Sequence, residues 1–324
     1  MLVEKVKFYW NYFNQESRKF IEEIKYRVKH IAEGNEELCY FYFFNKSYKD
    51  LELRLKILKY FYPNYAPYTF FDGVISFFKG DKVKAKECFL KFKEVDPRHA
   101  INNYYLNILD NVENITLPED VVRLYFEVSA NFYTQLNNAS IELYVSQIGV
   151  NQDKLKLDQE KVSVLDLGCG TGIFTKKIYK FLGKNPEIIA IDFASNMLEK
   201  AIKKFIKEEK YLYLQTINKN AFDYLEQDNT KFDIIIASEL IPYVNDLETL
   251  FKSLANKMFD SSKVILTFEF NDNKENRSFS TDYFKYIYTR DYIKEILHKN
   301  KLKIVSEPLN ASSGHTVMII KKEI

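Results

Sequence analysis

Three glycines alternate with larger residues in the stretch DLGCGTG at positions 166–172. Because glycine has no side chain, a ligand can approach the backbone closely at such a loop. The apolar stretch VSVLDL at 162–167 predicts a strand that runs into the loop, and a helix-like segment begins near Phe174. The free amide N–H groups at such a helix start attract the polar groups of a ligand. The pattern therefore predicts a nucleotide-like cofactor at this loop.

The position of the third glycine indicates which cofactor the loop suits. A dinucleotide-binding loop reads G-x-G-x-x-G, whereas here Gly172 comes one residue early and Ile173 follows it. Asp192 ends a second predicted strand at 187–192, and an acidic side chain there can accept hydrogen bonds from both hydroxyls of a ribose. Because the glycine spacing departs from the dinucleotide-binding pattern, an NAD(P) enzyme is the least favoured alternative.

Four stretches together resemble class I methyltransferases, which use S-adenosylmethionine (SAM). They are FEVSANFY at 126–133, VLDLGCGTG at 164–172, DFASNML at 192–198 and FDIIIASELIPY at 232–243. The resemblance covers about residues 122–322. It implies SAM as cofactor, S-adenosylhomocysteine as product, and a Rossmann-like α/β fold with a seven-stranded mixed sheet. The residues that it implies for cofactor binding are Tyr133, Asp166, Gly168, Cys169, Gly170, Gly172, Asp192, Phe193, Met197, Asn220, Ala221, Phe222 and Glu239.

Two positions depart from the family pattern. Asn220 stands where Asp is common, and its amide oxygen can still accept a hydrogen bond from the adenine amino group. Thr134 stands where an Asp usually follows the tyrosine that corresponds to Tyr133. Cys169 is expected to fill space in the loop rather than to act as a nucleophile.

Glu239 and Tyr243 are the candidate catalytic residues. By the resemblance, residues 232–243 end beside the transferred methyl group, so these side chains would orient the methyl acceptor. Enzymes that methylate adenine or amides usually have Asp or Asn before Pro-Pro-Tyr or Pro-Pro-Phe here. This chain has Ile241-Pro-Tyr243 without that acid or amide, which argues against base methylation. A general base is needed only if the acceptor arrives protonated.

The chemistry-bearing stretches fall within a predicted alternation of strands and helices. Five short apolar strands separated by helix-length segments indicate a parallel sheet, and two more indicate a closing hairpin. A helix is expected at about 119–147. The polar and aromatic segment 271–288 is expected to lie over the substrate pocket. The predicted strands are 162–167, 187–192, 211–216, 232–238, 263–268, 302–307 and 315–321.

Residues 66–99 have the spacing of a tetratricopeptide (TPR) repeat. Its small–small–aromatic–proline positions are filled by Gly73, Ala85, Phe89 and Pro97. Small residues at 73 and 85 would let two antiparallel helices approach closely. The alternative is an ordinary helical bundle with a chance proline spacing.

A polar stretch at 111–120 is predicted to be a linker. The predicted domains are an all-α TPR-like domain at 1–115 and a SAM-binding domain at 116–324. Stacked helical repeats often bind extended peptides, so a peptide or protein partner is expected there. With this N-terminal TPR-like domain, the whole chain resembles a bacterial family of predicted TPR-containing methyltransferases. The resemblance implies no particular substrate.

The composition argues against nucleic-acid-binding, metal-binding and membrane proteins. The 47 Lys and Arg nearly balance the 45 Asp and Glu, giving a net charge of +2, which argues against a nucleic-acid partner. The three cysteines have neither disulfide nor zinc-site spacing, so no metal is expected and a reducing, cytoplasmic setting is favoured. No apolar run approaches the ~20 residues that span a bilayer, so the chain is expected to be soluble and without a membrane partner.

Two functions remain open from the sequence. The favoured one is a SAM-dependent methyltransferase acting on an oxygen or nitrogen atom of a protein or small metabolite, with the helical domain contributing to substrate or partner binding. The alternative is a non-catalytic SAM-binding protein whose TPR-like domain is a protein-interaction module.

Overall fold

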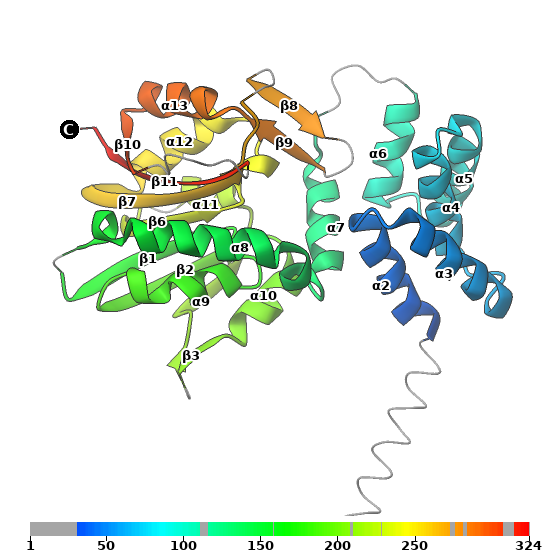
Figure 1. Ribbon diagram of the computed structural model, residues 1–324, viewed down its shortest axis with the longest axis horizontal. Coiled ribbons are helices and arrows are strands. Elements are labelled where there is room, and N and C mark those ends of the chain that lie inside the picture. The colour runs from blue at the N-terminus through cyan, green and yellow to red at the C-terminus, as the bar shows by residue number, and fades with distance from the viewer. Residues whose placement is uncertain are drawn as a thin grey trace, which may run out of the picture. The chain divides into compact units, whose positions relative to one another are not determined.

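The computed structural model describes residues 31–110, 116–157, 159–207, 210–227, 229–272, 276–280, 284–306 and 314–323 (Figure 1). The chain divides into two compact units, residues 1–112 and 113–324. The predicted domain boundary, after residue 115, lies three residues beyond this division.

The described part of the first unit is entirely helical. Its core is built from large aromatic side chains, which accounts for the aromatic-rich sequence of this region. Among them, Phe43, Phe70, Phe71, Phe89, Tyr104 and Tyr105 are at most 2 % exposed. The helices are α2 (Ile31–Phe44), α3 (Tyr48–Phe61), α4 (Pro67–Phe78), α5 (Lys82–Val95) and α6 (Ala100–Leu109).

Helices α4 and α5 pack closely at Gly73. A Cβ atom at this position would lie 2.6 Å from Cε1 of Phe89. Ala85 is fully buried in the same unit. Gly80 adopts a left-handed φ of 83° in the connecting turn, and the Asp81 carboxylate caps α5 by accepting from the Lys84 backbone N–H. The close approach that the sequence predicted at position 73 is therefore present.

We expect Gly73→Ala to destabilise the first unit. The ring of Phe89 stacks on Tyr105 with centroids 5.5 Å apart, so it cannot yield freely to an added methyl group. Overpacking costs about 1–3 kcal/mol, which outweighs the ~1 kcal/mol that alanine gains in helix propensity. The matched control is Gly149→Ala near the end of α8 (Tyr133–Val150), where a Cβ would meet only Phe181 at 3.6 Å and should stabilise. Denaturation of the full-length variants measures both effects, and stabilisation by both would contradict the packing argument.

His99 is the N-cap of α6 and is also buried, at 9 % exposure. Its Nδ1 accepts from the Asn102 backbone N–H, so the ring proton lies on Nε2 and points to the Tyr40 hydroxyl, 2.8 Å away. Burial lowers the pKa of His99 to about 4, against a smaller opposing effect of Asp96. The neutral imidazole is therefore part of the folded unit.

The second unit contains the predicted seven-stranded mixed sheet. Its strand order is β5 (Gln215–Asn218), β2 (Asn185–Asp192), β1 (Lys161–Leu167), β6 (Phe232–Ser238), β7 (Met258–Glu269), β11 (His315–Lys322) and β10 (Leu302–Ser306). The first five are parallel, and β11 runs antiparallel between β7 and β10.

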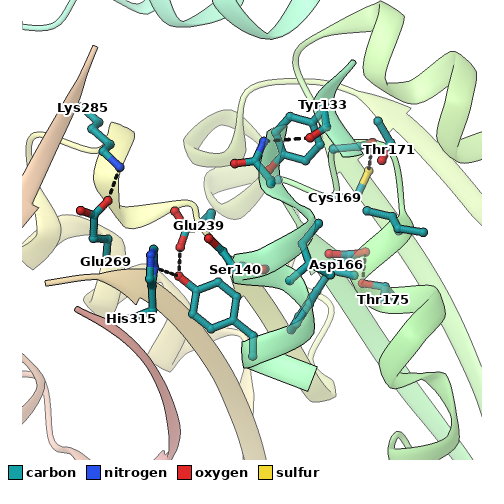
Figure 2. A pocket seen from close by; sticks show the side chains of 18 residues that line it. Tyr133, Ser140, Asp166, Cys169, Thr171, Thr175, Glu239, Glu269, Lys285 and His315 are labelled. Carbon is teal, nitrogen blue, oxygen red and sulfur yellow. Dashed lines mark hydrogen bonds and ion pairs between the residues drawn. The ribbon is translucent and has the colours of Figure 1, made fainter. Parts of the chain in front are cut away.

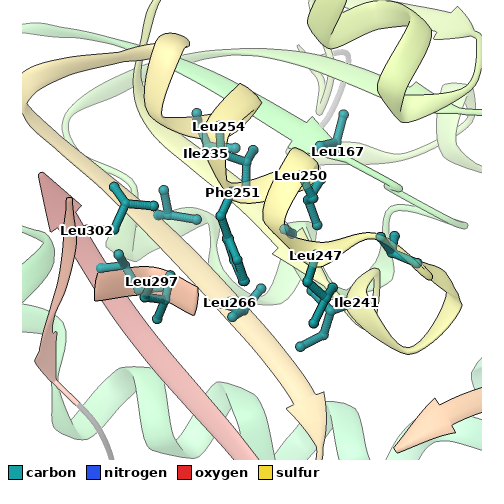
Figure 3. Packing of buried hydrophobic residues seen from close by; sticks show 14 of the residues in the cluster. Leu167, Ile235, Ile241, Leu247, Leu250, Phe251, Leu254, Leu266, Leu297 and Leu302 are labelled. Carbon is teal, nitrogen blue, oxygen red and sulfur yellow. The ribbon is translucent and has the colours of Figure 1, made fainter. Parts of the chain in front are cut away.

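Helices cover both faces of the sheet, as the apolar strands require. Leu165 and Leu167 of β1 face a core shared with α11 (Ala221–Gln227), α12 (Leu247–Asn256) and α13 (Arg290–Lys299) (Figure 3). On the opposite face, Val162 and Val164 pack with α8 and α9 (Ile173–Ile178). The remaining helices are α7 (Glu119–Ser129) and α10 (Ser195–Ile202), and the remaining strands are β3 (Phe205–Lys207), β4 (Lys210–Tyr211), β8 (Arg277–Ser280) and β9 (Lys285–Tyr288).

Three predictions of secondary structure need correction. The third parallel strand is residues 215–218 rather than 211–216. Leu212 and Tyr213 lie outside the strand pairing, because both side chains are buried in the core that β1 shares with α8 and α9. The single helix expected at 119–147 is two helices, with a turn closed by the bond from Phe132 N–H to the Ser129 carbonyl. The sequence favours an edge strand beginning at His315, whereas this strand, β11, lies inside the sheet between β7 and β10.

The segment 271–288 forms a two-stranded hairpin, β8–β9, in its described part. It is held against the chain that follows β6: the Tyr288 hydroxyl donates to the Val244 carbonyl, and Arg277 donates to the Asn245 side chain. Within the described residues, no helix is both long and apolar enough to cross a bilayer.

Candidate active site

The direction in which the sheet grows reverses between β1 and β6. From β1 the chain adds β2 and β5 on one side, and it then returns to add β6 and β7 on the other. Helix α9 after β1 and α12 after β6 accordingly cover opposite faces. A crevice opens at the carboxyl ends of the strands at such a switch point, and ligands bind there.

The glycine loop lines this crevice in a conformation that favours glycine. Gly168, Gly170 and Gly172 have φ values of 73°, 54° and 73°, in the left-handed region that larger residues avoid. The backbone N–H groups of Gly168 and Cys169 both donate to the Ile191 carbonyl, at 2.8 and 3.0 Å. The loop is thereby fixed to the end of β2.

Two buried carboxylates hold the loop from either side. Asp166 accepts hydrogen bonds from the hydroxyls of Thr175 and Tyr213, both at 2.6 Å. Asp192 accepts from the backbone N–H of Gly170 at 2.7 Å and from that of Ala194 at 2.9 Å. Burial raises the pKa of each carboxyl to about 6, although these hydrogen bonds oppose it.

A cavity of about 210 Å³, here called the Asp192 cavity, opens beside Asp192. Its lining is largely apolar and aromatic, and the Arg123 guanidinium lies 5.3 Å from the centre of the Phe193 ring. An apolar slot with a carboxylate at one end suits a nucleoside. The apolar and aromatic residues lining it include Val122, Phe126, Phe193, Ala221, Phe222, Leu240 and Tyr243.

A second cavity of about 260 Å³, the His315 cavity, is polar and charged. Glu239, Glu269, Lys285 and His315 lie on one side of it, and Asp166, Cys169 and Thr171 lie on the other (Figure 2). The two cavities share Tyr133, Gly168, Gly170, Ser238 and Glu239 in their linings. They therefore meet where the glycine loop faces the end of β6.

Glu239 is the centre of a hydrogen-bonded group in the His315 cavity. It has a left-handed φ of 53°, and its backbone N–H donates to the Thr267 carbonyl at 2.9 Å. The Tyr144 hydroxyl donates to its carboxylate and lies 2.9 Å from Nδ1 of His315. Burial raises the pKa of Glu239, while the bond from Tyr144 lowers it. Nearby, Lys285 pairs with Glu269.

Most sequence-predicted residues lie around these cavities. Tyr133, Asp166, Gly168, Cys169, Gly170, Asp192, Phe193, Asn220, Ala221, Phe222, Glu239 and Tyr243 line one or both. Gly172 caps α9 behind the loop. Met197 lines neither cavity, because it is fully buried against Ala130 and Ala194.

Two predicted residues have contacts that the sequence did not suggest. The Asn220 amide oxygen accepts from the Phe222 backbone N–H at 2.8 Å, and its amide nitrogen donates to Glu119. Tyr243 lies in an aromatic group with Phe126, at a centroid distance of 4.8 Å, and lines only the Asp192 cavity. Tyr243 is thus placed apart from the charged cluster around His315.

A buried hydroxyl in the His315 cavity supports the binding of SAM there. The hydroxyl of Thr171 lines the His315 cavity and is buried, yet it has no hydrogen-bond partner within the part of the chain that the structure describes. A buried hydroxyl of this kind is normally satisfied. A ligand with polar groups that crosses the glycine loop would supply the missing partner.

Residues 158–314 match the family model described as a methyltransferase domain. Together with the sheet order and the glycine loop, this match decides the identity of the second unit. It carries a class I methyltransferase domain. SAM is the cofactor of this class, and the loop after β1 with the two cavities is its candidate site.

The chain is similar to curated methyltransferases of several kinds. It is 25 % identical over 118 residues to a malonyl-[acyl-carrier protein] O-methyltransferase of Priestia megaterium, covering 36 % of this chain and 40 % of that protein. It is 26 % identical over 149 residues to a demethylmenaquinone methyltransferase of Anoxybacillus flavithermus, covering 45 % and 61 %. The chain thus spans less than two thirds of the length of these relatives.

Among solved structures, an O-methyltransferase family protein of Burkholderia thailandensis aligns with a TM-score of 0.49 and 13 % identity, covering 69 % of this chain and 71 % of that one. Within the described residues, no group of three or more His, Cys, Asp or Glu side chains is placed to hold a metal ion.

Sequence reasoning missed Tyr144, Glu269, Lys285 and His315 as cavity residues. The carboxyl ends of parallel strands share one edge of a sheet, and an antiparallel strand begins at that edge. Glu269 ends β7 and His315 begins β11, and the two are paired in register. That rule could have located both, whereas Tyr144 and Lys285 carry no such signal.

Proposed function

We propose that this protein is a SAM-dependent methyltransferase that acts on an oxygen or nitrogen atom of a small metabolite or a protein. The observation that carries the proposal is the junction of an apolar cavity beside Asp192 with a charged cavity at Gly168, Gly170 and Glu239. When bound, SAM supplies a methyl group that its positive sulfur makes electrophilic. The chain's own residues bind the cofactor, align the acceptor and exclude water.

The residues divide between the two ends of the cofactor. The Asp192 oxygens would accept from the ribose hydroxyls, since each carboxylate oxygen can take a second hydrogen bond. Phe193 and Phe222 would border the adenine, and Asn220 would hold its amino group. Tyr133 and Thr171 would contact the methionine end in the His315 cavity. Tyr243 would border the nucleoside rather than the acceptor.

Glu239 lines both cavities, so it would sit beside the transferred methyl group. We expect Glu239→Ala to lower methyl transfer about tenfold or more, because a hydrogen bond to a charged group is worth about 1.5–3 kcal/mol. Glu248→Ala, an exposed position on α12, is the control. Turnover is measured by label transfer and SAM affinity by calorimetry. Retention of both by the Glu239→Ala variant would remove Glu239 from the site.

The names of the relatives support a methyl acceptor that is a small metabolite or a group attached to a carrier protein. Their names specify a malonyl-[acyl-carrier protein] and a demethylmenaquinone as the molecules they act on. The helical unit would contribute to acceptor or partner binding as a TPR-like module, a role that the close α4–α5 packing at Gly73 supports.

Tritiated SAM incubated with the protein and a cell extract tests the proposal. We expect label in the small-molecule fraction, whereas label in the protein fraction would identify a protein acceptor and implicate the helical unit. SAM binding in a calorimeter without label in either fraction would favour a non-catalytic SAM-binding protein. Binding of NAD but not SAM would overturn both.

A further inference from the structure

The side of the His315 cavity that faces away from the glycine loop contains groups that cofactor binding does not require. Tyr144, from α8, and His315, at the start of β11, contact each other there, and Glu239 contacts Tyr144. Figure 2 shows Glu239 and His315 on this side of the cavity. Glu269 and Lys285 form an ion pair in the same cavity. Glu239 lines both cavities, and the rest of this charged and hydrogen-bonded set lies across the His315 cavity from the glycine loop. The set is therefore placed to receive the methyl acceptor.

The contacts fix which nitrogen of His315 carries the proton. An ionised Glu239 only accepts hydrogen bonds, so the Tyr144 hydroxyl donates to it. The Tyr144 oxygen can then only accept from His315, and Nδ1 of the imidazole must be the protonated nitrogen. Nε2 is left with a lone pair, and it has no hydrogen-bond partner among the residues that the structure describes.

We propose that Nε2 of His315 is the general base for a hydroxyl acceptor, with Tyr144 and Glu239 as positioning residues. The inference rests on the methyltransferase function proposed above. The acceptor's O–H bond breaks and its proton moves to Nε2, while an oxygen lone pair forms the new bond to the methyl carbon and the carbon–sulfur bond electrons stay on sulfur. His315 then releases the proton to water.

A base selects for the hydroxyl class of acceptor. A carboxylate is already an anion, and an amine whose ammonium proton has gone to water before transfer attacks through its free lone pair, so neither needs a base during transfer. An alcohol or phenol would become a strongly acidic oxonium if its proton stayed. A general base in the site therefore favours O-methylation of a hydroxyl group, which would give an ether.

Burial favours the neutral form of His315. The groups facing it are Tyr144 on α8, Glu239 after β6, Glu269 at the end of β7 and Lys285 on β9. Burial lowers the pKa of His315, and Lys285 adds to that effect while Glu269 opposes it. A neutral imidazole is the form that accepts a proton.

The tautomer can be measured without any methyl transfer. Long-range ¹H–¹⁵N spectra of the full-length protein, assigned by single histidine substitutions, should show His315 protonated on Nδ1. In Tyr144→Phe the Nδ1 proton loses its acceptor, so the Nε2-protonated form should grow. A wild-type His315 protonated on Nε2 would overturn the proposal.

Label transfer from tritiated SAM into extract, with His315→Asn, tests the role in catalysis. We expect at least a 100-fold loss of transfer with SAM affinity within about threefold of wild type, and unchanged transfer in His298→Asn, an exposed control on α13. The wild-type label should resist alkali and be released as methyl iodide by hot hydroiodic acid, as an ether requires. Label lost in mild alkali, as from an ester, or retained on nitrogen would overturn the proposal, as would equal transfer by the variant. A wild-type protein that labels nothing would instead refute the proposed methyltransferase function.

Discussion

Asp192→Ala should weaken SAM binding about 100-fold or more. The Asp192 carboxylate is 7 % exposed and is the acidic group at the end of β2 that borders the apolar cavity. Two hydrogen bonds from ribose hydroxyls to a charged oxygen pair are together worth about 3 kcal/mol or more, which corresponds to about a 100-fold change in affinity. The same substitution frees the Gly170 and Ala194 N–H groups that the carboxylate now holds. Calorimetric titration with SAM measures the loss.

Two further variants separate this role from general stabilisation. Asp192→Asn keeps one acceptor oxygen and should lose about tenfold. Asp233→Ala is the matched control, because the Asp233 carboxylate also accepts two hydrogen bonds, from the Ser163 N–H at 2.8 Å and hydroxyl at 2.6 Å, but lies near the opposite end of its strand. It should lower stability and leave SAM affinity unchanged. A folded Asp192→Ala variant that binds SAM within about threefold of wild type would refute the assignment.

The helical unit should lose about 3 kcal/mol of unfolding free energy as the pH falls from 6.5 to 4, owing to His99 alone. In the unfolded chain His99 has its ordinary pKa of 6.5, and in the folded unit burial lowers the pKa to about 4. Between these values the unfolded chain binds a proton that the folded unit does not, so stability rises with pH across this window and is complete above 6.5. Each unit of pKa difference is worth about 1.36 kcal/mol.

His99→Asn isolates this contribution from the carboxyl groups that titrate over the same range. Asparagine can still cap α6, because its side-chain oxygen can accept from the Asn102 N–H. Calorimetry of both full-length proteins should show a difference in stability that shrinks as the pH falls from 6.5 to 4. His298→Asn keeps His99 and should retain the wild-type pH dependence, so disappearance of that dependence in His298→Asn would locate the effect elsewhere. A pH-independent difference for His99→Asn would mean that the imidazole charges freely in the folded unit.

The sequence alone was sufficient to predict the glycine loop and the strands that position it. Glycine spacing, the acid at position 192 and the apolar strands around them are local features, and each depends on residues that are close in the chain. These features led directly to the loop after β1, to the Asp192 cavity and to the seven-stranded sheet. The error at residues 211–216 has the same origin, because only tertiary packing buries Leu212 and Tyr213 outside the ladder.

Apart from Glu239, the residues of the proposed acceptor end were found only in the tertiary structure. Tyr144, Glu239, Glu269, Lys285 and His315 come from five separate elements or loops, and no local spacing relates them. They meet because β11 inserts antiparallel beside β7 and because α8 and the β8–β9 hairpin place their side chains at the same edge of the sheet. A cofactor-binding loop consists of consecutive residues, so its pattern can be recognised in the sequence. A pocket for the acceptor is formed by residues that are distant in the chain, and only the fold brings those residues together.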